Sequence, residues 1–250
     1  MSLEELEMNV DQRPNTTLGA QDHVQWIADE VEALLAVAED DVDQATPSCP
    51  GWTVGTVLDH LARGAGMGWA TWFRDDADID GMAVLTNLPP ATTGSAARTL
   101  FHQTMPDYVA LLRSTPPDKD CFWFTGPVPA AFLFRLGAVE IATHRADVDL
   151  ALDHTPELSD DRAHDAVHLS AEFLPQLWKR RSEPTPPPVQ LLPAGGQPVT
   201  IGDGAPVATA SGSSTDLWLT LWGRPAPKPI IKGDSNALDQ WAQSAPTSPI

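Results

Sequence analysis

The sequence is poor in basic residues and in cysteine. Only 15 Lys and Arg residues stand against 34 Asp and Glu, which gives a formal net charge of −19 at pH 7. Phosphate groups bind to clustered basic side chains, so this balance argues against nucleic acid as a partner. It argues equally against docking on an anionic membrane. The two cysteines, Cys49 and Cys121, form no CxxC pair, so nothing in the sequence calls for a secreted scaffold held by disulfides.

Long apolar runs and a targeting segment are also missing. No stretch approaches the roughly 18 consecutive apolar residues that a membrane-spanning helix needs. The opening residues, MSLEELEMNV, contain neither a basic region nor an apolar core, so we expect no secretory signal. GxSxG, a P-loop and a GxGxxG leading into a helix are absent as well. We therefore expect a cytoplasmic protein, monomeric or homodimeric, whose partners are small molecules.

Helical periodicity dominates the first two thirds of the chain. Residues 1–18 are polar and aperiodic and are predicted to form a flexible tail. Apolar residues then recur at helical spacing, so we predict a helical bundle over residues 19–181. Residues 182–188 are predicted to be a proline-rich linker. Residues 189–250 combine short strand-like pieces with short helices, which predicts a small mixed α/β domain. The expected fold class is α+β.

Local signals refine this prediction at three places. Thr53 is expected to cap the helix that follows the Pro-Gly turn. Pro106 is expected to kink or split a helix over residues 95–114. Residues 75–94 are rich in Asp, Pro and Thr and are expected to form a long loop.

Glu140 and His144 lie in AVEIATHRADVDLAL, a stretch that otherwise suits a buried helix. Four residues apart, they lie on one helix face about one turn from each other. A carboxylate among apolar neighbours is costly unless it is paired, protonated or bound to a cation. A metal ion and an ordinary surface hydrogen bond both account for the pair.

His60 lies at the margin of the apolar stripe of an earlier helix, in TVLDHLA. Together with Glu140 and His144 it would provide two imidazoles and one carboxylate, the ligand set of a catalytic zinc site with an open position. Nickel or iron uses similar ligands, and His60 taken singly also fits an ordinary core histidine. Asp147, one turn beyond His144, is either the acceptor that orients an imidazole or a surface acid.

Other candidate sites are weaker. His164 and His168 are also four residues apart, but they fall beside the apolar stripe of their helix, so we predict a solvated face. The segment DADIDG imitates the start of a calcium loop, yet its last ligand position falls on Asn87 where a Glu is expected. It is therefore predicted to be an acidic surface loop. Cys49 has no neighbouring His, which disfavours a role as nucleophile.

The segments CPGWTVGTVLDHLA and, about 80 residues later, EIATHRADVDLAL resemble the mycothiol-dependent maleylpyruvate isomerase family. That family belongs to the DinB-like superfamily of metal-binding four-helix bundles. The segment ATASGSSTDLWLTLWGR is similar to the family's C-terminal part, so the resemblance covers about residues 20–244. It implies that His60, Glu140 and His144 bind one zinc ion. It also implies that mycothiol is the thiol cosubstrate and that Arg224 takes part in activity.

The resemblance implies a zinc-dependent enzyme that adds a metal-activated thiolate to a small electrophile. The reaction would be that of the isomerase or of a mycothiol S-transferase. The planar guanidinium of Arg224 suits a carboxylate of the substrate or the cosubstrate. Two other classes also fit the residues: a metal-binding or small-molecule-binding module without catalysis, and a zinc hydrolase that needs no thiol.

Overall fold

The computed structural model describes residues 17–74, 80–124, 126–181 and 184–243. The described chain forms two compact units, of which the first contains Gly19–Pro47 and Gly51–His154. The second contains Ser48–Pro50 and the chain from Thr155 onward. The first unit is almost entirely helical and the second holds a four-stranded sheet, which confirms the predicted α+β class. Nearly all of the predicted tail and most of the acidic loop lie outside the described residues.

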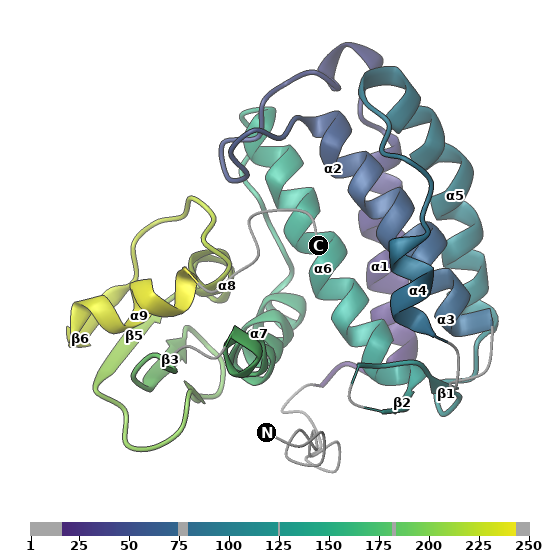
Figure 1. Ribbon diagram of the computed structural model, residues 1–250. Helices are drawn as coiled ribbons and strands as arrows, with labels where there is room; N and C mark the ends of the chain where they lie inside the picture. The colour runs from purple at the N-terminus through teal and green to yellow at the C-terminus, as the bar shows by residue number, and fades with distance from the viewer. Residues whose placement is uncertain (1–16, 75–79, 125, 182–183, 244–250) are drawn as a thin grey trace. The chain divides into compact units, whose positions relative to one another are not determined.

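Four helices form the core of the first unit (Figure 1): α1 (Ala20–Leu35), α2 (Val54–Leu61), α5 (Gly94–Ser114) and α6 (Ala130–Ala151). Helix α6 packs on both α1 and α2. Its first turns are apolar nearly all round, and most of its residues, including several polar ones further along, are buried. No helix among the described residues is long and apolar enough to cross a membrane.

Helix α5 runs through Pro106 as one element, so the break that the sequence allowed does not occur. Proline removes one backbone hydrogen bond of the helix, and the packing of α5 on α1, α2 and the segment after α2 holds the helix together across that position.

The remaining elements of the first unit are short. They are η2 (Glu39–Asp41), the π-helix η3 (Ala62–Trp69), α3 (Ala70–Arg74), α4 (Gly81–Thr86), β1 (Asp120–Cys121) and β2 (Val128–Pro129). Helix α4 lies inside the segment that was predicted to be a loop, and that prediction is wrong there. Its N-terminus is fixed by the Asp80 carboxylate, which accepts a hydrogen bond from the backbone N–H of Ala83.

Thr53 caps α2 as predicted: its hydroxyl oxygen accepts a hydrogen bond from the backbone N–H of Thr56. We expect Thr53→Ala to lower the free energy of unfolding by about 1 kcal/mol, because the first turn loses this acceptor. Urea unfolding of the metal-free protein measures the change. Thr99→Ala, at an exposed position inside α5, is the control and is expected to be nearly neutral. Equal losses in both variants would contradict a capping role.

The second unit combines α7 (Asp160–Arg181) with a sheet and two further helices (Figure 1). The sheet has the order β4-β3-β5-β6; β3 and β5 are parallel and the other pairs are antiparallel. Its strands are β3 (Val189–Pro193), β4 (Val199–Ile201), β5 (Ala208–Gly212) and β6 (Ile230–Gly233), and its other helices are α8 (Ser214–Leu221) and α9 (Ser235–Ala242). Helix α7 packs on α8 and β4. The sequence placed the end of the helical domain at residue 181, after α7. In the structure, α7 belongs to the second compact unit, whose main part begins at Thr155.

Candidate metal centre

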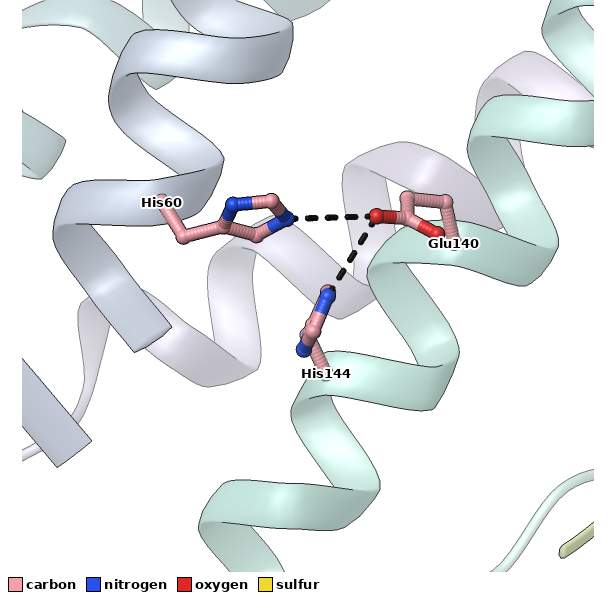
Figure 2. Close-up of side chains that lie close together, drawn as sticks. All are labelled: His60, Glu140 and His144. Carbon is pink, nitrogen blue, oxygen red and sulfur yellow. Dashed lines mark hydrogen bonds and ion pairs between the residues drawn. The ribbon is translucent and has the colours of Figure 1, made fainter. Parts of the chain in front are cut away.

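Three potential ligands converge from two helices of the first unit. Helix α2 carries His60 in its last turn, and α6 carries Glu140 and His144 one turn apart. Figure 2 shows the three side chains pointing toward one another. Nε2 of His60 and Nε2 of His144 each lie 3.3 Å from the same carboxylate oxygen, Oε1 of Glu140. The convergence expected from the sequence is therefore present.

The donor set fits a metal ion in both chemistry and spacing. One ligand atom from each of His60, Glu140 and His144 can be chosen so that all three lie within 4.8 Å of one another. A tetrahedral zinc ion with bonds of about 2.0–2.1 Å sets its ligand atoms about 3.3 Å apart, which matches both nitrogen–oxygen distances. No second group of this kind occurs among the residues that the structure describes.

The site is partly open to solvent. The side chains of His60 and Glu140 keep 20% and 28% of their surface exposed, whereas that of His144 keeps 9%. The exposed part of the group therefore lies at His60 and Glu140, while His144 is the most buried of the three.

Electrostatics inside the group favour charged side chains. Burial would raise the pKa of Glu140, but hydrogen bonds and attraction from His144 and His60 outweigh it and hold that pKa far below its usual range. Burial would lower the pKa of His144, but hydrogen bonds from Asp147 and Glu140 and their negative charges raise it to about 9. The metal-free group thus concentrates negative charge around an imidazole, an environment that also suits a cation.

Asp147 fixes the orientation of His144. The Nδ1 atom of His144 donates to Oδ2 of Asp147 at 2.9 Å, and the Asp147 side chain is fully buried. This bond leaves Nε2 of His144 directed at Glu140, which is the arrangement that metal-binding histidines use. Of the two interpretations of Asp147, the surface acid is wrong because the carboxylate has no exposure.

Trp52 borders the site, although no helical or strand pattern in the sequence indicated a role for it. Its ring stacks on that of His144 with centroids 5.9 Å apart and an interplanar angle of 9°, and it lies 5.4 Å from the ring of His60. The available signal was the Pro-Gly turn immediately before it, which reorients the chain at the start of α2.

The competing histidines lie in the second unit. His164 is half-buried and its Nε2 is 3.3 Å from the carbonyl oxygen of Ala194. His168 is only 2% exposed, so the predicted solvated face is wrong there. Because α7 packs on both α8 and β4, its buried arc is wider than the apolar stripe alone indicated.

Arg224 also lies in the second unit, directly after α8, and is buried. Its Nη1 donates to the carbonyl oxygen of Trp222 at 2.6 Å, and its Nη2 donates to Sγ of Cys49 at 3.7 Å. The guanidinium therefore has a defined position within that unit, held by a carbonyl and a thiol.

Comparison with known proteins gives one family match and two similar solved structures. Residues 13–149, more than half of the chain, match the family model of the mycothiol maleylpyruvate isomerase N-terminal domain. No curated protein gives a significant match. Among solved structures, the chain is similar to the crystal structure of the mycothiol-dependent maleylpyruvate isomerase, with a TM-score of 0.62, 14% sequence identity and coverage of 88% of this chain and 96% of that one. A histidine-to-alanine mutant of that enzyme gives a TM-score of 0.63 at 15% identity, with the same coverage.

Proposed function

Because the chain belongs to the family defined by the mycothiol maleylpyruvate isomerase N-terminal domain, it is an enzyme of the mycothiol-dependent isomerase type, and we propose that it depends on zinc. The proposed ligands are His60, Glu140 and His144. The single observation that carries the proposal is the convergence of three such donors within 4.8 Å of one another, with both nitrogen–oxygen distances at the spacing of a tetrahedral zinc site.

The chain's own residues prepare this site. Glu140 brings a negative charge that offsets part of the charge of the cation, and Asp147 holds His144 in one orientation. The exposure of His60 and Glu140 leaves room for a thiol to approach. A zinc ion at this position would lower the pKa of a bound thiol, so that its thiolate form is available at neutral pH.

The proposed reaction takes place between mycothiol and an electrophile with a cis double bond. The thiolate sulfur adds to one alkene carbon, the former double bond rotates as a single bond, and the sulfur leaves to give the trans isomer. In a transferase the addition product takes up a proton and is released. We further propose that Arg224 binds a carboxylate of the reactants, because its planar fork matches that group.

Calorimetric titration of mycothiol against zinc-loaded and chelator-stripped protein tests this function. We expect mycothiol to bind saturably only to the zinc-loaded form. In a separate assay, only that form should isomerise maleylpyruvate, and only when the thiol is present. A form that binds zinc but no mycothiol would favour a non-catalytic metal-binding module. Turnover of an ester or amide by the zinc form without any thiol would favour a hydrolase. S-alkylated mycothiol is the matched control ligand, since it cannot form a thiolate and is expected to bind more weakly.

A further inference from the structure

The His144 ring is held from several directions, and the contacts differ in what they restrain. Hydrogen bonds from Nδ1 to Asp147 and from Nε2 to Glu140 act in the plane of the ring. A ring held only along that line can still tilt about it. The flat face of Trp52, within 9° of parallel, opposes this tilt. The indole thus restrains the one rotation that the two carboxylates leave free.

Trp52 is itself fixed by the loop that carries it. Gly51 adopts a φ of 87°, a left-handed conformation that glycine accepts without strain. The Trp52 carbonyl oxygen accepts hydrogen bonds from both the backbone N–H and the hydroxyl of Thr46, at 3.0 and 3.2 Å. Two residues later, the N–H of Val54 donates to the carbonyl of Gln44 at 2.9 Å. The Trp52 side chain keeps only 8% of its surface exposed, so neighbours hold both its backbone and its ring.

The same ring contacts the second imidazole. Trp52 lies 5.4 Å from His60, and the His60 and His144 rings are 4.7 Å apart at 67°. One indole therefore touches the two histidines that come from different helices, α2 and α6. We propose that Trp52 is a positioning residue of the metal centre, which sets the tilt of His144 and its angle to His60. This inference rests on the proposed zinc site.

Metal affinity measures this role without any turnover. We expect Trp52→Leu to weaken Zn²⁺ binding at least about 10-fold in competition with a chromophoric chelator, the size of effect seen when groups that orient metal ligands are lost. Trp52→Phe keeps a flat face and is expected to stay within about threefold of the wild type. Trp123→Leu is the matched control. Trp123 is a buried tryptophan of the same unit whose ring packs against Phe124 and Phe132 and which is not in the metal group. Its loss is expected to leave affinity unchanged.

Thermal unfolding of the metal-free variants separates positioning from folding. If Trp52→Leu shows no cooperative unfolding, it is not folded and its zinc affinity says nothing about positioning. The test then uses Trp52→Phe alone, read by the visible absorption of bound Co²⁺. A ring that sets imidazole orientation must shift those bands when it becomes smaller, and a ring that only fills space leaves them unchanged. If Trp52→Leu folds and binds zinc as tightly as the wild type, the inference is overturned and the zinc site stands. If the Leu variant does not fold, unshifted Co²⁺ bands in Trp52→Phe have the same meaning. A wild-type protein that binds no zinc overturns both.

Discussion

Replacing His144 with alanine is expected to weaken zinc binding by at least about 100-fold, because loss of a group that merely orients a ligand already costs 10- to 100-fold. The substitution removes one of three converging ligands and leaves two, His60 and Glu140. It also removes the hydrogen-bond donor that faces the buried Asp147 carboxylate. Elemental analysis after dialysis should find about one zinc per chain in the wild type and almost none in the variant. Thiol-dependent turnover should fall with the metal.

His164→Ala provides the matched control for this prediction. Like His144, His164 is a helical histidine with a hydrogen-bond partner, but it is half-buried and belongs to the second unit. It is expected to retain zinc and activity. Full retention of zinc by a folded His144→Ala protein would refute the proposed ligand set, whereas loss of zinc from both variants would point to general destabilisation.

Asp147→Asn is expected to reduce zinc affinity by about 10- to 100-fold while the three ligands stay in place. The side chain keeps its shape and an oxygen that can accept from Nδ1 of His144, but it loses the negative charge that makes the imidazole a better electron donor. Competition with a chelator at fixed pH measures the affinity, and circular dichroism checks that the fold is kept.

Asp149→Asn makes the same chemical change two residues further along α6. The Asp149 carboxylate pairs with Arg145 at 3.1 Å and does not belong to the metal group. We expect this variant to bind zinc as the wild type does. If both asparagine variants lose affinity equally, the effect comes from charge on α6 in general, and the orienting role of Asp147 would have to be abandoned.

Most signals of the candidate site are local in the sequence, but joining His60 to Glu140, 80 residues further on, relied on the expected bundle and on the family resemblance. Glu140 and His144 are set by helical spacing, His60 by its place beside an apolar stripe, and Asp147 by one further turn of the same helix. In a regular helix, the position of a residue in the sequence determines which face of the helix it lies on. The α+β class followed in the same way, since helical and strand-like patterns occupy separate parts of the chain.

The parts that the sequence did not reveal depend on contacts between distant segments. The role of Trp52 requires the pairing of residues 44–46 with residues 52–54, which no local pattern indicates. The burial of His168 depends on two neighbours that pack on α7. Helix α4 has only six residues, too few to show a period, and the strands β1 and β2 have two each.

The π-helix η3, which directly follows the helix of His60, has a consequence for how this protein can evolve. A methyl group on Gly66 would lie 2.9 Å from the hydroxyl oxygen of Thr104 in α5, and one on Gly68 would lie 2.8 Å from Leu85 in α4. Gly64 meets no such neighbour. A side chain therefore fits at Gly64 as the segment stands, whereas one at Gly66 or Gly68 requires Thr104 or Leu85 to move first.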